Sequence, residues 1–319
     1  MTTLHIILCR WFGCCNSSAC QISKIQRQVR VFLHRTRERK KIELEIFTRE
    51  MGLIESEEDE DFVKETLEKE KYIGIDTEFN WRNTYFPELS LLQISTSSKI
   101  LLIDCLKCKK LRYLKKILED RTKTIVMHSS RSDTTVLNTN LKIKLNNCFD
   151  IQIAEKFING GEIKNYGFIV AKYFGYDLDK SETNSNWLKR PLTHKQLEYA
   201  ADDVNFLIPI YEKQLKDLKK LKKEQEANIN FKKETLLGNQ ELYISRLKKL
   251  KKASKEERDI FLWREKHASE KNLPPSYIFE DKFLKKIVKK IKNKKEEPNK
   301  IFKLFKDNSA AKDFLKFIE

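Results

Sequence analysis

Hydrophobic and polar residues alternate along several short segments in the first two thirds of the chain. Segment 72–79, YIGIDTEF, places Ile73, Ile75 and Thr77 on one face and Asp76 and Glu78 on the other. This two-residue period is typical of a half-buried β-strand. Further apolar runs of strand length occupy 90–96, 99–105 and 124–130. We therefore expect strands at these four segments.

Helical spacing of apolar residues occurs between and after these segments. It is found at 56–70, which opens with acidic residues suited to a helix N-terminus, at 111–120 and around 133–141. The clearest helix follows Thr193 and Gln196, which have the spacing of a capping box, and Pro209 is predicted to kink or break it. Strands followed by helices predict an α/β or α+β protein with a mixed sheet flanked by helices, and we take α/β as the first choice.

Shifts in composition divide the chain into four segments. Residues 1–50 form an Arg-rich leader, which is either a transit peptide or a spurious extension upstream of a start at Met51. Residues 51–215 form the main domain, and 216–239 read as a Lys-rich helical linker. Residues 240–319 are predicted to form a second, helical domain.

The net charge of +17 is unevenly distributed over the 319 residues. Residues 51–215 hold 24 Lys and Arg against 26 Asp and Glu, whereas 216–319 hold 30 against 17. A basic flank beside a neutral body favours a polyanionic partner, although a solvated lysine-rich surface gives the same composition. The absence of an apolar run of about 18 residues argues against a membrane-spanning helix.

Two carboxylates, Asp76 and Glu78, lie side by side in apolar surroundings, where their mutual repulsion costs stability. A bound divalent cation removes this cost, since Mg²⁺ prefers carboxylate oxygens. Asp133, at an expected helix start, and Asp203, one helical turn after Tyr199, are candidates to complete such a site. Taken alone, the pair Asp76 and Glu78 does not favour a metal site, because a strand-end Asp is often merely a cap or a loop contact.

The segments GIDTEF, MHSSRSD and WLKRPLTHKQLEYAADDV together resemble the DEDDy 3′–5′ exonucleases, and ribonuclease D in particular, over about residues 52–210. The resemblance implies a ribonuclease H-like fold with two divalent ions, Mg²⁺ or Mn²⁺. It also implies that Tyr199 orients the attacking water. The implied metal ligands are Asp76, Glu78, Asp133 and Asp203.

Two positions complicate this assignment. Asp202 also lies within one turn of Tyr199, but the family spacing Tyr-x-x-x-Asp selects Asp203, which leaves Asp202 to face solvent or to aid electrostatics. Asn186 stands where the family usually has Asp, which weakens an acidic role there.

Three further residues are candidates for substrate contact, each with a structural alternative. Phe79 either stacks on a terminal base or packs in the core. His128 either helps to order the site or is a hydrogen-bonded structural histidine. Arg190 either contacts phosphate or pairs with an acid.

Residues 261–287 resemble the helicase-and-RNase-D C-terminal (HRDC) domain, a small all-α bundle. In ribonuclease D this domain assists RNA binding, although such domains also bind proteins. The residues that carry the resemblance are Trp263, Arg264, Glu265, Ala268, Asn272 and Pro274.

These resemblances imply a metal-dependent 3′–5′ exoribonuclease that trims structured RNA, such as tRNA precursors, and releases 5′-mononucleotides. We expect a cytoplasmic monomer with no membrane association, or an organellar protein if 1–50 is a transit peptide. The alternatives are a DNA-directed 3′–5′ exonuclease with the same metal centre and an inactive RNA-binding protein of the same fold.

Overall fold

A computed structural model describes residues 49–292 and 299–318, in a chain that divides into units 1–49 and 50–319. The predicted leader, 1–50, lies outside the described residues except for its last two. No helix in the described ranges is long and apolar enough to cross a membrane.

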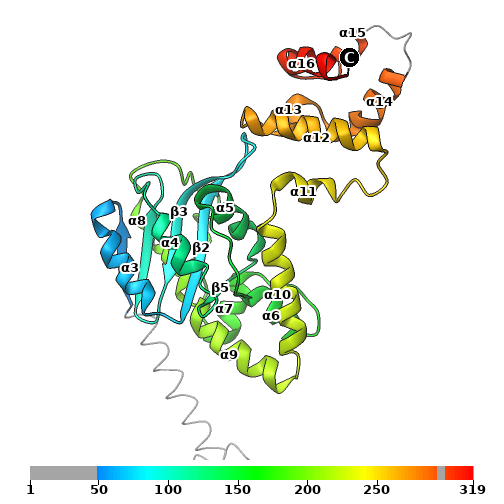
Figure 1. Ribbon diagram of the computed structural model, residues 1–319. Helices are drawn as coiled ribbons and strands as arrows, with labels where there is room; N and C mark the ends of the chain where they lie inside the picture. Colours follow the sequence, from blue (N-terminus) through cyan, green and yellow to red (C-terminus); the bar gives the residue numbers. More distant parts are fainter. Residues whose placement is uncertain (1–48, 293–298, 319) are drawn as a thin grey trace, which may run out of the picture. The chain divides into compact units, whose positions relative to one another are not determined.

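A mixed six-stranded sheet forms the centre of the first part of unit 50–319 (Figure 1). Its order is β1-β4-β3-β2-β5-β6; β2, β3 and β4 are antiparallel, and the other neighbours are parallel. The predicted mixed sheet is confirmed. Its strands are β1 (Glu50–Ile54), β2 (Tyr72–Asn80), β3 (Glu88–Ser95), β4 (Lys99–Asp104), β5 (Thr124–Met127) and β6 (Cys148–Asp150).

Two of these strands, β1 and β6, were not predicted. β6 has only three residues, which is too short for a period of two to be seen. β1 begins at Glu50, inside the segment assigned to the leader, and pairs with β4 at the edge of the sheet.

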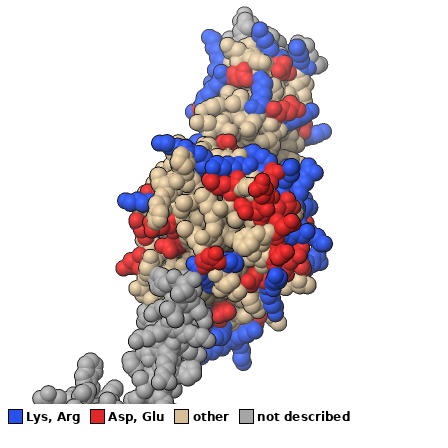
Figure 2. Space-filling view, turned by 90° about the vertical axis from the view of Figure 1, so that its left-hand side faces the viewer, with Lys and Arg blue, Asp and Glu red and all other residues tan. Residues whose placement is uncertain are grey.

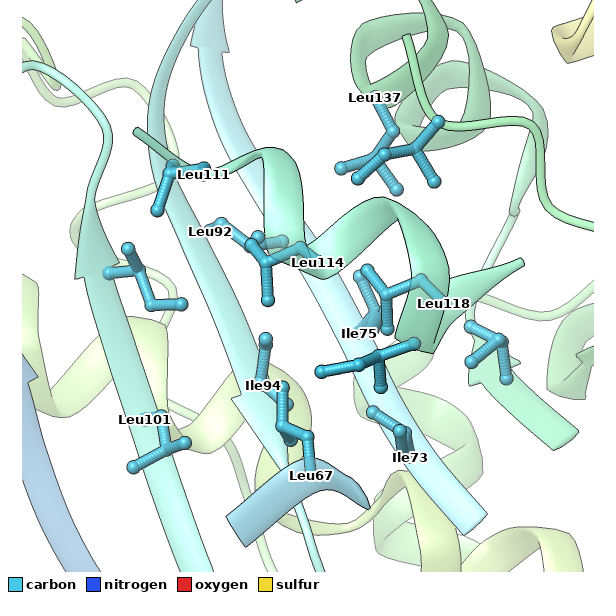
Figure 3. Close-up of a cluster of buried hydrophobic side chains, with 14 of the residues drawn as sticks. Leu67, Ile73, Ile75, Leu92, Ile94, Leu101, Leu111, Leu114, Leu118 and Leu137 are labelled. Carbon is cyan, nitrogen blue, oxygen red and sulfur yellow. The ribbon is translucent and has the colours of Figure 1, made fainter. Parts of the chain in front are cut away.

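One face of the sheet is covered by α3 (Glu60–Glu68), α4 (Arg112–Leu118) and α5 (Arg131–Leu141). Figure 3 shows Leu67, Leu114 and Leu137, one from each helix, around Ile73 and Ile75 of β2. All five side chains are fully buried. Burying a side chain of this size contributes about 1.5–3 kcal/mol, so this layer holds β2 firmly in place.

Helices α8 (His194–Asn205) and α9 (Leu207–Lys220) also pack against the sheet: α8 contacts β2, β3 and β4, and α9 contacts β2 and β5. The predicted capping box of Thr193 and Gln196 starts α8. The expected break is confirmed at Phe206, and Pro209 lies in the first turn of α9, where a backbone N–H is not needed. The shorter helices α6 (Ile151–Ile158) and α7 (Tyr166–Phe174) precede α8.

Residues 216–239 form the end of α9 and the helix α10 (Glu224–Gly238), which packs on α5 and β6. Ala227 and Phe231 are buried, and a Cβ atom at Gly238 would lie 2.7 Å from Thr134. This segment, which we expected to be a Lys-rich helical linker, is helical but is part of the packed structure. Its apolar positions are too sparse among lysines to reveal this from the sequence.

The predicted helical unit after residue 240 is observed, and we call helices α11 to α16 the C-terminal module. Its buried cluster includes Phe261, Phe279 and Phe314. On the face shown in Figure 2, Lys and Arg side chains are intermixed with Asp and Glu. The helices are α11 (Leu242–Leu247), α12 (Lys255–Glu270), α13 (Pro275–Ile278), α14 (Leu284–Lys292), α15 (Asn299–Phe302) and α16 (Asn308–Ile318).

Candidate active site

Strand β2 supplies the first two acids of the candidate site. Asp76 and Glu78 are partly buried and lie opposite Gln93 and Leu91 of β3. The pairing of β2 with β3 is irregular between Glu78 and Phe79. Such a bulge bends the strand and changes the direction of the side chains that follow it.

Asp133 lies in the first turn of α5, the helix that follows β5, and only 6% of its surface is exposed. β5 runs parallel to β2, which brings the start of α5 towards β2. The hydroxyl of Thr77 donates a hydrogen bond to Asp133 Oδ1 at 2.5 Å. Thr77 therefore ties α5 to the strand that carries the first two acids, a role that its place on the opposite strand face did not suggest.

Helix α8 supplies Tyr199 and Asp203, and a hydrogen bond from Tyr199 stabilises the charged form of Asp203. The Tyr199 hydroxyl also lies 3.3 Å from the hydroxyl of Thr183. Asp202 instead faces Tyr176, whose hydroxyl donates to its Oδ2 at 3.4 Å. The two neighbouring aspartates thus have different partners.

Burial raises the pKa of all four acids, and three of them are also raised by other members of the group. Burial and then the charges of Asp133, Asp203 and Glu78 raise the pKa of Asp76 well above its ordinary value. The pKa of Glu78 rises to about 9, through burial and the charges of Asp203 and Asp133. Burial raises the pKa of Asp133 and the pKa of Asp203 to about 7 each. The fold has therefore brought all four predicted acids within electrostatic reach of one another.

The chemistry of these side chains fits a hard divalent cation. Within the described ranges, none of the four acids forms an ion pair with Lys or Arg. Carboxylate oxygens are the ligands that Mg²⁺ and Mn²⁺ prefer. No three His, Cys, Asp or Glu side chains of residues 49–292 and 299–318 are close enough together to hold one ion. Carboxylates without a cation repel one another, which disfavours their close approach. A cation bound between them would attract each carboxylate and so outweigh this repulsion.

A cavity of about 370 Å³ opens beside Glu78. Phe79 lines this cavity and also packs against the main core. Trp81 and Arg82 line it as well, and the sequence analysis missed both. The signal for them was available, since an aromatic and a basic side chain directly follow the acidic pair. The remaining lining residues are Asn80 and the segment 183–188.

His128 and Arg190, which the sequence suggested as candidates for substrate contact, both have partners within the protein. The His128 ring packs against Tyr166 with centroids 5.5 Å apart, and its Nε2 lies 3.2 Å from the amide nitrogen of Gln152. Arg190 forms an ion pair with Asp104, with Nε 2.6 Å from Oδ2 and Nη2 2.9 Å from Oδ1. The guanidinium is thus held by an acid, which is one of the two roles expected for it.

Comparison with known families agrees with this geometry. The model of a 3′–5′ exonuclease family matches residues 52–219, which include all four acids and Tyr199. The chain belongs to the 3′–5′ exonuclease family. A second model, of the HRDC domain, matches residues 258–301 of the C-terminal module. We call residues 50–238 the exonuclease domain from here on.

Curated relatives of this chain are ribonuclease D sequences, which confirms the resemblance stated above. The ribonuclease D of Desulfotalea psychrophila is 34% identical over 230 residues, which cover 67% of this chain and 60% of the relative. The match thus spans about three fifths of the length of that relative.

Solved structures show the same fold. Escherichia coli RNase D, described as an exoribonuclease involved in structured RNA processing, superposes with a TM-score of 0.74 at 24% identity, covering 84% of this chain and 73% of that one. Brucella melitensis NrnC with bound Mg²⁺ matches with a TM-score of 0.51 at 23% identity, covering 60% and 92%. At these identities the matches establish the fold alone: the predicted mixed sheet flanked by helices and, in the match to RNase D, the helical C-terminal region.

Proposed function

We propose that this protein is a metal-dependent 3′–5′ exoribonuclease that shortens structured RNA, such as tRNA precursors, and releases 5′-mononucleotides. The observation that carries the proposal is the group of four acids from β2, α5 and α8, whose pKa values are all raised by burial, three of them also by charges within the group, and which have no Lys or Arg partner in the described residues. Membership of the 3′–5′ exonuclease family supports the polarity of the reaction.

Asp76, Glu78, Asp133 and Asp203 would hold two divalent ions. When bound, these ions supply a water that is nucleophilic at neutral pH and positive charge that stabilises the leaving 3′ oxygen. The Thr77 hydrogen bond fixes the orientation of the Asp133 carboxylate, which leaves its Oδ2 for a ligand role. Mg²⁺ is the first choice for an all-oxygen donor set, and Mn²⁺ is the second.

Tyr199 would orient the attacking water through its hydroxyl. Burial and the charge of Asp203 raise the pKa of Tyr199 above its usual value, so the phenol keeps its proton at neutral pH. A protonated phenol is a hydrogen-bond donor and acceptor but a poor base. Its contribution is therefore to position the water, with Thr183 as a second partner that holds the ring.

The cavity beside Glu78 would receive a terminal nucleotide, with Phe79 in contact with its base. The C-terminal module would bind RNA upstream of the 3′ end. Its helix α14 carries the lysine-rich sequence LKKIVKKIK, which suits contact with phosphates. We take RNA and not DNA as the substrate because the relatives of this chain are named ribonuclease D.

Digestion of a tRNA-like RNA tests this proposal. The full-length protein is incubated with 5′-labelled RNA and with a DNA oligomer of the same sequence, with Mg²⁺ or with chelator. We expect a ladder with one-nucleotide steps from the RNA, 5′-mononucleotides as products, and no cleavage with chelator. Faster shortening of the DNA would instead support the DNA-directed alternative.

Tight RNA binding without shortening under Mg²⁺ or Mn²⁺ would contradict the proposal and support an inactive RNA-binding protein. Asp76→Asn is the matched control because it removes one carboxylate without changing the volume of the side chain. Loss of the ladder in this variant, with RNA binding retained, would exclude a contaminating nuclease as its source.

A further inference from the structure

The connection between β2 and β3, residues 81–87, carries a tyrosine that belongs to a different hydrophobic core. Tyr85 is 3% exposed, and its ring is part of the buried cluster of the C-terminal module, together with Phe261 and Phe279. The connection starts only three residues after Glu78 of the candidate active site. A residue of the exonuclease domain is thus a core residue of the module.

Polar groups enclose the Tyr85 ring on the module side. Its hydroxyl donates a hydrogen bond to Glu265 Oε2 at 3.1 Å, and the Arg246 guanidinium lies 4.9 Å from the ring centroid. Arg246 also pairs with Glu265 at 2.8 Å. The phenol therefore adds a hydrogen bond to a partly buried ion pair, and burial together with the charge of Glu265 raises the Tyr85 pKa so that the hydroxyl remains a donor.

The backbone of the connection is held as well. The side-chain oxygen of Asn272 accepts hydrogen bonds from the backbone N–H groups of Tyr85 and Phe86, both at 3.1 Å. Asn272 itself has a φ of +49°, a left-handed conformation that asparagine tolerates. Within the connection, the Trp81 indole N–H donates to the carbonyl of Tyr85 at 3.0 Å. We call Tyr85, with its partners Glu265, Arg246 and Asn272, the hairpin anchor.

The other end of the connection faces the candidate active site. Trp81 and Arg82 line the cavity beside Glu78, and Trp81 is the residue that bonds to the carbonyl of Tyr85. One segment of seven residues therefore contacts both the cavity for the terminal nucleotide and the core of the module. When the separation of two binding surfaces matches the span of one ligand, the ligand binds far more tightly than it does to either surface alone.

We propose that Tyr85 is a positioning residue that holds the C-terminal module beside the active-site cavity, so that RNAs long enough to reach both are bound at two places. The inference rests on the proposed function, because it takes RNA as the ligand. The hairpin anchor then sets the preference for long over short substrates, while the chemistry at the four acids is independent of it.

RNA binding and cleavage by full-length variants test this proposal. Tyr85→Ala removes the anchor, Asn272→Gly removes the two backbone hydrogen bonds while keeping the left-handed conformation, and Tyr85→Phe removes only the bond to Glu265. Tyr243→Ala, at an exposed position of the same module, is the matched control. Each protein receives a single-stranded RNA of about 25 nucleotides and one of about four, in chelator for binding and in Mg²⁺ for cleavage.

We expect Tyr85→Ala and Asn272→Gly to weaken binding of the long RNA about tenfold or more, with a matching fall in kcat/KM, while the short RNA is unaffected. Tyr85→Phe should lie between these variants and the control. An equal loss for both RNAs would overturn the proposal in favour of a purely structural role, and so would the absence of any loss. If the wild-type protein cleaves neither RNA, the proposed function fails, and the binding comparison still decides the role of Tyr85.

Discussion

Buried acids occur in two contrasting environments in this molecule. Asp104 in β4 and Glu265 in the C-terminal module are neutralised by arginines of the same chain, Arg190 for the first and Arg246 and Arg264 for the second. The acids Asp76, Glu78, Asp133 and Asp203 have no such partner in the described residues; burial raises the pKa of all four, and charges within the group raise three of them further.

The difference shows up in the direction of the pKa shifts. Burial raises the pKa of Asp104, but the hydrogen bonds and charge of Arg190 outweigh it and hold this pKa below the ordinary value. At the candidate site, burial and like charges act in the same direction. A buried carboxylate paired with an internal cation costs the fold little, whereas this group destabilises the fold until a cation arrives from solution.

The largest expected effect follows from removing one site acid. Asp76→Asn should lower the rate of RNA shortening by at least about a thousandfold, since a lost metal ligand removes several kcal/mol of transition-state stabilisation. The same variant should melt at a higher temperature than the wild type in chelator, because it relieves repulsion. Single-turnover assays and thermal melts measure the two effects.

Asp202→Asn is the matched control for this first prediction, because it makes the same chemical change next to Asp203. Its activity should stay within a few-fold of the wild-type value. A fall as large as that of Asp76→Asn would show that the two neighbouring aspartates have been assigned the wrong roles.

Breaking the internally paired acid should have the opposite effect on stability. Arg190→Met leaves the fully buried Asp104 carboxylate without its cation, which should lower the free energy of unfolding by about 3–5 kcal/mol. Urea unfolding measures this change. The double variant Asp104→Leu, Arg190→Met should recover most of the loss, and an unchanged midpoint in Arg190→Met would argue against the pairing.

Tyr199→Phe tests a smaller contribution at the site itself. Loss of the hydroxyl should lower kcat about 10- to 100-fold, because the water is less well oriented, and should weaken metal binding only slightly, because Asp203 loses one hydrogen bond. A loss of metal affinity as large as the loss of kcat would indicate that Tyr199 acts mainly through Asp203 and not on the water.

Stability should depend on pH in opposite directions for the two environments. The site acids have raised pKa values in the folded state, so the metal-free protein should lose stability as the pH rises from about 5 to about 8. Asp104 has a lowered pKa, so its contribution should be lost only as the pH falls below about 4. The rise in melting temperature on adding Mg²⁺ should therefore be larger at about pH 8 than at about pH 6. A Mg²⁺ effect that does not change with pH would contradict this account.

The elements that carry the site were largely predictable. The alternation at 72–79, the capping box at Thr193 and the break near Pro209 each follow from local preferences that the tertiary structure reinforces. α10 was not recognised as a packed helix, because its few apolar residues, such as Phe231, show their burial only when α5 is in place.

The residue types of the site were also predictable, but their partners were not. Four acids in family spacing identify the candidate ligands. The bond from Thr77 to Asp133 and the pairing of Arg190 with Asp104 depend on contacts between residues 56 and 86 positions apart. The same holds for Tyr85, whose local sequence gives no sign that it is buried in another module.

Direct titration with Mn²⁺ tests the central claim, that the four acids together hold divalent cations. Isothermal titration calorimetry on wild-type protein, in two buffers of different ionisation enthalpy, should show two Mn²⁺ bound per chain with release of protons at about pH 6.5. Asp76→Asn and Asp203→Asn should each lose at least one of these ions. Wild-type stoichiometry and affinity in both variants would contradict the claim.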